Sequence, residues 1–520
     1  MLKSILAAFL LLSPAALLAE LSLPNVFSDH MLLQRDTEAA IWGKADPGAE
    51  ITVSFKGASA KAKADSEGRW KAQIATGAAD ATGVELIVTS GSDTVKIADV
   101  LVGEVWLASG QSNMSFRMTG ALGGREVIAE SNFPEIRTFV APNVTAVDPQ
   151  DDIEGEWMLA TPETLPGYSA VAFFFTRKLH QELGIPVGMI VTAWGGKPVE
   201  TFTSREALNS HPASKLLVDR AVAADAAYDP EKAKATYEAQ LAKWEATVAE
   251  QKKKPATERK IPRKPAFARR ALDTEGKAGV LFNSMINPFV GYTMQGAIWY
   301  QGEGNAKAGA VPYDESLPLM INDWRERWGD DISFYYVQLA DFKEVATEPG
   351  NNDPWPLLQD RMRLVLDTTP KTGMAIINDI GDAKDIHPKN KHDVGERLAL
   401  WALAKDYGQD IVYSGPLFKA SEAKDGAIRV TFAQAGEGLK SRDGGELKRF
   451  EIAGDDKVWH WADAKIGGKN AVIVSCPDVE HPVAVRYAWA ANPEGSNLVN
   501  SEGLPASIFR SDDWDDVLEE

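Results

Sequence analysis

The chain has 520 residues, 44% of them hydrophobic, and a formal net charge of −19. This length predicts roughly two to four domains with buried cores, and the negative charge disfavours nucleic acid and anionic membranes as partners. A neutral polysaccharide or a small sugar is compatible with this charge. Cys476 is the only cysteine, which excludes an intrachain disulfide and disfavours a structural zinc site.

Residues 1–19 have the pattern of a secretory signal peptide. Lys3 precedes an apolar run at residues 5–12, and small residues follow up to Ala19. The run is too short for a stable membrane span, and no later run is long enough to cross a bilayer. We expect an exported protein without a membrane span, and the lack of disulfides favours a bacterial periplasmic or extracellular location.

Residues 20–99 carry short segments of period-two alternation, separated by turn sequences such as Asp46-Pro47-Gly48. Strands are expected at residues 39–43, 50–55, 69–74 and 84–89. Short strands at this spacing predict a small N-terminal β-sandwich.

From about residue 100 to 410, strands and helices alternate, which predicts a doubly wound α/β domain with a parallel sheet. Strands are expected at residues 105–108, 187–193, 297–300, 334–339 and 374–378. Helices are expected at residues 170–183, 316–328, 356–366 and about 393–406. Residues 411–520 return to strand-like alternation and predict a C-terminal β-domain.

An insertion at about residues 205–276 interrupts the α/β pattern. Its first part, 231–254, is rich in alanine and charge and places Tyr237, Leu241 and Trp244 at helical spacing. Its second part, 255–270, is an extended basic segment. Two interpretations stay open, namely a solvated excursion, or a flap over the site or a partner surface.

Polar residues cluster where the predicted parallel strands end. Gly110-Gln111-Ser112-Asn113 follows the first strand, Trp194-Gly195-Gly196 the second, Gln301-Gly302-Glu303-Gly304-Asn305 the third, and the 382–387 loop the last. Ligands of open α/β sheets bind beyond the carboxyl ends of the strands, so we expect these segments to meet at one edge.

Ser112 and His387 are the candidate nucleophile and general base. A serine hydroxyl attacks when a base takes its proton, and a third group usually orients that base. Asp385 and Asp382 lie just before His387, and either could accept a hydrogen bond from its ring. A helix N-cap or an Asx-turn would explain Ser112-Asn113 alone, but the convergence of four strand ends favours catalysis.

An acyl-transfer site also needs hydrogen-bond donors for the developing oxyanion. The candidates are the N–H of Ser112, the N–H of Gly195 or Gly196, and the side-chain amide of Asn305. No two histidines have the spacing of metal ligands with carboxylates, so we expect neither a metal nor a cofactor.

In combination, the motifs resemble the sialate O-acetylesterase family, which belongs to the SGNH (GDSL-like) hydrolases. The matching segments are residues 110–114 (GQSNM), 194–196 (WGG), 298–303 (IWYQGE) and 385–391 (DIHPKNK). The resemblance extends to residues 24–35 and 497–506, and so covers nearly all of the chain after residue 19.

The resemblance implies an SGNH-type doubly wound, flavodoxin-like parallel sheet flanked by N- and C-terminal β-domains. It also implies a metal-independent serine esterase that removes acetyl groups from sugar hydroxyls. Ser112 would be the nucleophile, His387 the general base, and the backbones of Ser112 and Gly196 part of the oxyanion hole. The residues expected to form that hole or to bind substrate are Gly196, Asn305, Gln111 and Gln301.

Two departures from the SGNH pattern leave the acid of the triad open. The usual Asp three residues before the base is Lys384 here, and the third block reads Gly302-Glu303-Gly304-Asn305 where Gly-x-Asn-Asp is usual. Asp385 is the preferred acid, Asp382 and Glu303 are alternatives, and a Ser–His dyad is a further one.

The expected substrates are O-acetyl esters of sialic acid. The alternatives are an acetylxylan or other polysaccharide deacetylase and, from another class, a non-catalytic carbohydrate-binding protein. A sialate carboxylate would need a nearby cation, and the candidates that follow the motif strands are Arg117, Arg125, Lys197 and Arg205.

Overall fold

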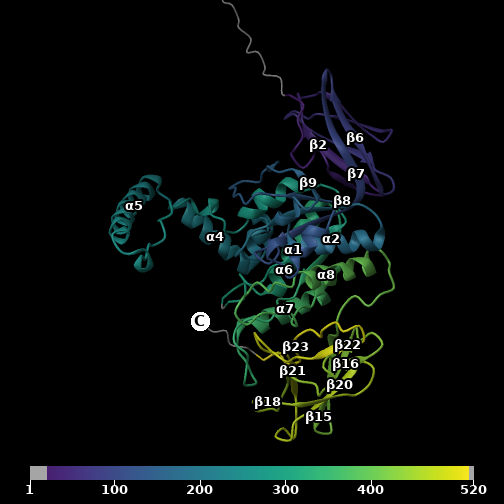
Figure 1. Ribbon diagram of the computed structural model, residues 1–520, viewed down its shortest axis with the longest axis vertical. Helices are drawn as coiled ribbons and strands as arrows, with labels where there is room; N and C mark the ends of the chain where they lie inside the picture. The colour runs from purple at the N-terminus through teal and green to yellow at the C-terminus, as the bar shows by residue number, and fades with distance from the viewer. Residues whose placement is uncertain (1–19, 308, 515–520) are drawn as a thin grey trace, which may run out of the picture.

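The computed structural model describes residues 20–307 and 309–514. The predicted signal peptide, residues 1–19, lies outside the described residues. An N-terminal β-domain, a central α/β body and a C-terminal β-domain follow one another along the longest axis (Figure 1). None of the helices in the described part of the chain is both long enough and apolar enough to cross a bilayer.

The N-terminal domain consists of short strands whose side chains alternate between core and solvent. In β5 (Arg69–Ala75), Trp70, Ala72 and Ile74 are buried and the residues between them are exposed, as the period-two pattern predicts. β4 (Ala58–Lys63) is missing from the sequence prediction, because its small and charged residues include no large apolar side chain. The other short strands are β1 (Leu32–Gln34), β2 (Glu38–Lys44), β3 (Glu50–Phe55) and β6 (Asp80–Ser90).

β7 (Asp93–Gly110) is an 18-residue strand that belongs to two sheets. Its first part pairs with β6 in antiparallel fashion, and its second part pairs in parallel with β10 (Val187–Ala193) and β11 (Gly296–Tyr300). Every residue from Val100 to Gly110 is buried. The predicted strand at 105–108 is therefore the end of a longer strand that joins the N-terminal sheet to the central one.

The central sheet also contains β8 (Phe133–Val140), β9 (Trp157–Ala160), β12 (Ser333–Val337) and β13 (Thr372–Ala375). Its order is β13-β12-β11-β7-β10-β8-β9, and only β9 pairs in antiparallel fashion. The predicted α/β sheet is confirmed, but its flavodoxin-like order is wrong, because that order would place β8 directly beside β7. β10 lies there instead. All seven residues of β10 are buried, whereas β8 is partly exposed, so the more apolar strand takes the inner position.

The helices of the central body are α1 (Gly124–Glu130), α2 (Ala170–Leu183), α6 (Tyr313–Trp328), α7 (Pro354–Thr368) and α8 (His392–Lys405). Neighbouring tyrosines of β12 contact different helices. The Tyr335 ring packs against Trp401 of α8, and Tyr336 donates a hydrogen bond to the Met362 carbonyl of α7. Adjacent strand residues point to opposite faces, so α7 and α8 cover opposite faces. α2 packs beside α8, and α6 beside α7.

The insertion forms α3 (Arg205–Ser210), α4 (Pro212–Ala226) and α5 (Pro230–Lys252). α5 stands away from the central body, at the left of Figure 1, and confirms the predicted helix. The segment after α5 runs back along it. The Tyr237 and Phe267 rings lie 5.6 Å apart, and the Trp244 indole donates a hydrogen bond to the Pro262 carbonyl. The apolar side chains of α5 thus pack against the insertion's own return segment.

The C-terminal domain has two four-stranded antiparallel sheets, β14-β15-β20-β19 and β18-β17-β21-β23, and the strand pair β16-β22. The strands are β14 (Leu417–Lys424), β15 (Ala427–Ala433), β16 (Leu439–Ser441), β17 (Phe450–Ala453), β18 (Trp459–Trp461), β19 (Asp463–Ile466), β20 (Ala471–Ser475), β21 (Ala484–Tyr487), β22 (Leu498–Asn500) and β23 (Phe509–Arg510). Residues of both sheets, such as Val430 and Val485, share one core.

Candidate active site

Ser112 lies just beyond the end of β7, on a turn that two glycines shape. Gly110 has a φ of +131°, and a Cβ atom there would lie 2.3 Å from the Tyr300 carbonyl oxygen of β11. Gly195, which follows β10, approaches from the other side, where a Cβ atom would lie 3.2 Å from Ser112 Cβ. Such close approach of the strand ends requires residues without a side chain. Ser112 therefore stands at the carboxyl edge of the sheet, between the ends of β10 and β11.

His387 contacts Ser112 although 275 positions separate them in the sequence. His387 Nε2 lies 2.8 Å from Ser112 Oγ. On one side the imidazole faces the Phe116 ring, with 6.5 Å between centroids and 28° between planes. The His387 side chain is 35% exposed, so the Ser112–His387 pair is open to a substrate from solvent.

Asp385 is the carboxylate at the far nitrogen of the His387 ring. Asp385 Oδ1 lies 3.3 Å from His387 Nδ1 and also accepts a hydrogen bond of 2.9 Å from the His387 backbone N–H. That backbone hydrogen bond is the largest influence on the pKa of Asp385, which is lowered from its ordinary value. Asp382 accepts a hydrogen bond from the N–H of Lys384, within its own loop. Of these two acids, Asp385 is the one at the imidazole.

Glu303 reaches the His387 loop through Asn113. Asn113 Nδ2 donates one hydrogen bond to Glu303 Oε1, at 2.5 Å, and one to the Ile386 carbonyl, at 3.0 Å. Glu303 Oε2 is buried and has no hydrogen-bond partner among the described residues. Burial raises the pKa of Glu303, which the hydrogen bond from Asn113 partly offsets. The Glu303 carboxylate therefore supports the backbone next to His387 rather than the imidazole itself.

Lys391 completes this buried network. Its ammonium group donates a hydrogen bond to Asn113 Oδ1 and lies 4.9 Å from the ring centroid of Phe116 and 5.2 Å from that of Tyr300. The side chain is fully buried, and this burial lowers the pKa of Lys391 to about 7, although the Glu303 charge acts to raise it. Sequence reasoning overlooked Lys391, even though it belongs to the 385–391 motif.

Comparisons with known proteins identify relatives of the chain. No protein-family model matches the sequence. The human and mouse sialate O-acetylesterases are 27% and 26% identical to the chain, over 90% of its length and over 87% and 89% of their own. The crystal structure of a carbohydrate acetylesterase from Xanthomonas citri is 36% identical, with a TM-score of 0.78, and the match covers 95% of this chain and all of that one. The chain belongs to the sialate O-acetylesterase family.

Membership of the sialate O-acetylesterase family makes the protein a carboxylic ester hydrolase and confirms the resemblance that the motifs indicate. The interpretation as a non-catalytic carbohydrate-binding protein is therefore not retained. The human and mouse relatives are named for sialate esters and the bacterial one for carbohydrate esters, so removal of acetyl groups from sugars is the activity common to them.

Three backbone N–H groups beside Ser112 are free to bind a ligand. The N–H groups of Ser112, Gly195 and Gly196 donate no hydrogen bond within residues 20–307 and 309–514. Gly196 has a φ of +71°, and a Cβ atom there would meet nothing within 4 Å, so there is open space next to its Cα atom. Such N–H groups can stabilise an oxyanion.

The Asn305 amide is held by residues of the segments that follow β10 and β11. Its Nδ2 donates to both carboxylate oxygens of Glu200, at 3.2 and 3.1 Å, and its Oδ1 accepts from the Val199 N–H and from Gln301 Nε2. The two contacts to one carboxylate form a bifurcated hydrogen bond, which directs the amide toward Glu200. The oxyanion role that the sequence suggests for Asn305 stays a prediction, and the hydrogen bonds of its amide are with Glu200, Val199 and Gln301.

Gln111 and Gln301 lie beneath the site, and both are buried. Gln301 Nε2 lies 3.3 Å from Gln111 Oε1, 2.7 Å from Asn305 Oδ1 and 3.2 Å from the Lys197 carbonyl oxygen. These contacts tie together the segments that follow β7, β10 and β11. Both side chains therefore hold the strand ends in place and do not face the solvent.

The four cations that could bind a sialate carboxylate differ in their contacts and in their exposure. Lys197 Nζ sits 5.3 Å from the Trp194 ring centroid and 3.8 Å from Glu275 Oε1. Arg205 donates from Nε to the Ala278 carbonyl. Arg117 and Arg125 are exposed. Only Lys197 directly follows the glycines beside Ser112.

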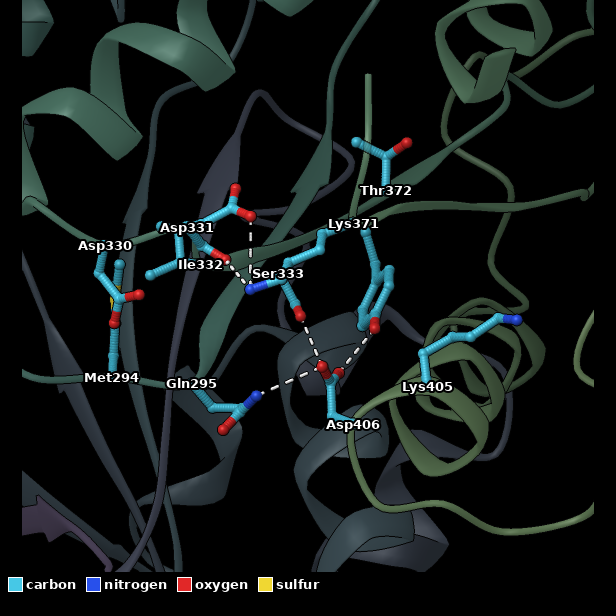
Figure 2. Close-up of a pocket in the computed structure, with 11 residues that line it drawn as sticks. Met294, Gln295, Asp330, Asp331, Ile332, Ser333, Lys371, Thr372, Lys405 and Asp406 are labelled. Atoms are coloured by element: carbon cyan, nitrogen blue, oxygen red, sulfur yellow. Dashed lines mark hydrogen bonds and ion pairs between the residues drawn. The ribbon is translucent and has the colours of Figure 1, made fainter. Parts of the chain in front are cut away.

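A cavity of about 390 Å³ lies at the edge of the sheet opposite to Ser112, where β11, β12 and β13 begin. Figure 2 shows the Asp406 carboxylate there beside Ser333 and Gln295. It accepts hydrogen bonds from Ser333 at 2.5 Å, from Tyr335 at 2.6 Å and from Gln295 at 3.3 Å. These bonds fix the end of α8 to the sheet. The residues that line the cavity include no histidine to serve as the base for a serine, so we assign it no part in ester hydrolysis.

One group of three potential metal ligands occurs within the described part of the chain. The ligand atoms of His460, Cys476 and Asp478 lie within 4.8 Å of one another. These residues belong to the C-terminal β-domain, on β18 and after β20, and not to the segments around Ser112.

Proposed function

We propose that this protein is an exported, SGNH-type serine esterase that removes O-acetyl groups from sugars, with O-acetylated sialic acids as its main substrates. The observation that carries the proposal is the distance of 2.8 Å between Ser112 Oγ and His387 Nε2. The names of the relatives support the sugar-ester chemistry, and the pattern of residues 1–19 supports export to the periplasm or the medium.

Acylation begins when Ser112 Oγ attacks the carbonyl carbon of the acetyl group. His387 Nε2 takes the hydroxyl proton as the new C–O bond forms. The N–H groups of Ser112 and Gly196 stabilise the oxyanion of the tetrahedral intermediate. The intermediate collapses when the bond to the sugar oxygen breaks, and His387 gives its proton to that oxygen, which leaves as a hydroxyl.

Deacylation repeats the same steps with water. His387 takes a proton from a water molecule whose oxygen attacks the acetyl carbon on Ser112. The bond to Ser112 Oγ then breaks, and Oγ recovers the proton from His387. Acetic acid leaves, loses its proton to solvent to give acetate, and the free enzyme is restored, without a metal or a cofactor.

Two acids support the base in different ways in this proposal. Asp385 holds the His387 ring at Nδ1 and stabilises the imidazolium that forms in each step. Glu303 acts as a positioning residue, because its contact to the His387 loop runs through Asn113.

Acetate release from a substrate panel tests the proposal. The panel contains O-acetylated sialic acid, acetylated xylan and simple acetylated sugars, with Ser112→Ala as the control. We expect release from the sialic acid ester by the wild type and a loss of several orders of magnitude in the variant, which stays folded by circular dichroism. Rapid quench and mass spectrometry should find an acetyl group on the Ser112 peptide.

Deacetylation of polysaccharides is the second candidate. It is favoured by the bacterial relative, which is more similar to the chain than the sialate O-acetylesterases and is named a carbohydrate acetylesterase. Faster release from acetylated xylan than from sialic acid esters would select this alternative. No release from any acetyl ester would overturn the esterase proposal itself.

A further inference from the structure

Three residues of the C-terminal domain carry side-chain groups that bind transition metals in proteins. His460 lies on β18, Cys476 follows β20, and Asp478 lies two positions further on. An imidazole nitrogen, the Cys476 Sγ atom and an Asp478 carboxylate oxygen lie within 4.8 Å of one another. β18 and β20 belong to different four-stranded sheets of the domain at the bottom of Figure 1, so the three groups bridge these sheets.

A tight turn places Asp478 beside Cys476. The Val479 N–H donates a hydrogen bond of 3.1 Å to the Cys476 carbonyl, which closes a four-residue turn over 476–479. Pro477 takes the second position of this turn, where its fixed φ is favourable. The local sequence Cys-Pro-Asp therefore brings a carboxylate back to the thiol.

Strand pairing directs His460 toward the same place. His460 stands opposite Ile452 of β17 in an antiparallel pair, and directly opposed residues point to the same face. Ile452 is fully buried in the core that the two sheets share. The neighbours Trp459 and Trp461 point to the other face, where the Trp461 indole donates a hydrogen bond to the Thr347 carbonyl. The His460 imidazole therefore faces inward, toward the sheet that contains β20.

The three side chains have no other polar partners. Within residues 20–307 and 309–514, the His460 imidazole, the Cys476 thiol and the Asp478 carboxylate make no hydrogen bond and no ion pair. Cys476 is 8% exposed and packs in the domain core, whereas Asp478 is exposed. The group is therefore open to solvent on the side of Asp478, where an ion and a water molecule can enter.

The set of donor atoms favours zinc. Zn²⁺ takes four ligands from Cys, His and Asp at about 2.0–2.3 Å, which places neighbouring ligand atoms roughly 3.3–3.8 Å apart. The three atoms already lie within 4.8 Å, so small side-chain rotations would close them around an ion. Ca²⁺ and Mg²⁺ prefer sets of oxygen ligands, whereas this set has one carboxylate beside a nitrogen and a sulfur. A single cysteine disfavours a zinc site in the sequence, but the fold adds a histidine and an aspartate to it.

We propose that His460, Cys476 and Asp478 form a structural zinc site, in which one Zn²⁺ links β18 to the turn after β20 and takes water as its fourth ligand. Cys476 Sγ gives its proton to solvent as the zinc–sulfur bond forms, and His460 binds through a ring nitrogen that carries no proton. The ion joins the two sheets of the C-terminal domain and stabilises that domain. Ester hydrolysis at Ser112 uses none of these residues, so this inference is independent of the proposed function.

Zinc titration of the purified protein, treated with EDTA and kept reduced with a phosphine, tests the site against a competing chromophoric chelator. We expect one Zn²⁺ per chain for the wild type. The affinity should fall by more than about 100-fold in Cys476→Ala and in His460→Gln, since residues that merely orient a metal ligand already contribute about 10- to 100-fold. Asp478→Asn should weaken binding by about 10-fold or more. The matched controls His481→Gln and Glu480→Gln alter exposed residues of the same loop outside the ligand set and should bind zinc as the wild type does.

Two further measurements identify the ligands and the role of the ion. Co²⁺ in place of Zn²⁺ should give a thiolate-to-metal charge-transfer band in the near ultraviolet for the wild type and His481→Gln, and none for Cys476→Ala. Saturating Zn²⁺ should raise the melting temperature of the wild type by a few degrees, because an ion that binds only the folded state stabilises it. It should not raise that of His460→Gln, which alters a half-buried side chain and serves as the test if Cys476→Ala fails to fold.

Equal zinc affinity of the wild type, Cys476→Ala and His460→Gln would overturn the site, as would the absence of stoichiometric binding. Cys476 would then be an ordinary small core residue. Hydrolysis of a small acetyl ester should be the same in EDTA and in Zn²⁺, and hydrolysis that requires Zn²⁺ would overturn the structural role. Because zinc binding is measured without a substrate, an inactive protein that binds zinc refutes only the proposed function, and an active esterase that binds none refutes only the zinc site.

Discussion

The ammonium group of Lys391 donates a hydrogen bond to the side-chain carbonyl of Asn113, 278 positions away in the sequence. This contact directs both hydrogens of the Asn113 amide to the Glu303 carboxylate and to the Ile386 carbonyl. Since Ile386 precedes His387, the residue after the nucleophile fixes the loop that carries the base. The Ser112–His387 distance therefore depends on a buried network as well as on the sheet.

Replacing Lys391 with Met tests this dependence. The variant keeps the apolar stem but removes the donor to Asn113, so the amide can turn and release the His387 loop. We expect kcat for a chromogenic acetyl ester to fall by about 10- to 100-fold with little change in KM, because small displacements of reacting groups are costly. Lys389→Met, an exposed change in the same loop, should leave kcat unchanged. Equal kinetics of the two variants would remove Lys391 from the positioning network.

The choice of the acid is tested by Asp385→Asn and Glu303→Gln side by side. Asp385 lies at His387 Nδ1, so its replacement should lower kcat by up to ~10⁴ as the orientation of the ring is lost. Glu303→Gln keeps an acceptor for Asn113 and should lower kcat by about 10-fold or less. A larger loss for Glu303 would reverse the assignment, and small losses for both would indicate a Ser–His dyad. Circular dichroism checks the fold of each variant.

Gly195 leaves little room for a side chain, because a Cβ atom would lie 3.2 Å from Ser112 Cβ and would press on the nucleophile. Gly195→Ala should displace the nucleophile and lower kcat by about 10-fold or more, with only a small change in melting temperature. Gly167→Ala is a suitable control, since a Cβ atom there would meet nothing within 4 Å. Unchanged turnover of Gly195→Ala would mean that the turn around Ser112 can adjust.

The ion pairs of His392 should make the stability of the fold depend on pH. Its hydrogen bond with Asp393, together with that to Glu396, raises the pKa of His392 to about 9. A pKa raised by folding stabilises the folded state fully below the unfolded value, near ~6.5, and this stabilisation is lost as the pH rises through about 9. At a pH of about 6, the free energy of unfolding of the wild type should therefore exceed that of His392→Gln by about 1 kcal/mol. The difference is small because the His392 side chain is 40% exposed and solvent screens its ion pairs.

Denaturant unfolding of both proteins at several pH values measures that difference. Above a pH of about 10 the two curves should coincide, because the neutral imidazole has lost its ion pairs. The comparison with the variant cancels other titrating groups, including Lys391. A difference that stays constant from pH 6 to pH 10 would contradict the assignment.

The outer part of the insertion should be dispensable for folding. α5 and its return segment pack on each other, and the ends of this unit meet where Tyr228 donates a hydrogen bond to the Ala268 carbonyl. Replacing residues 230–267 with a short Gly/Ser linker should leave the melting temperature and the hydrolysis of a small acetyl ester nearly unchanged. Loss of activity on a small ester would show that the insertion works as a flap over the site.

Local sequence patterns predict the helices and strand ends well where caps and burial coincide. α2 has the predicted bounds because Ser169 caps its start and Gly184 ends it in the left-handed region. The proximity of Ser112 and His387 also follows from the sequence, because both stand at carboxyl ends of strands of one sheet.

Other features depend on contacts between segments that no local pattern encodes. The position of β10 beside β7 is decided by the burial of whole strands in the assembled sheet. Asn305 turns toward Glu200 because a buried carboxylate from another strand end needs donors.

The continuity of β7 has a consequence for cooperativity. A strand that starts in the N-terminal sheet and ends two residues before Ser112 cannot lose one half without disturbing the other. The N-terminal domain should therefore not unfold independently of the central body. Its unfolding should also disrupt the turn that carries Ser112. Substitutions in the core of that domain, such as at Trp70, are expected to disturb the position of Ser112, because β7 connects the domain to the turn that carries this serine.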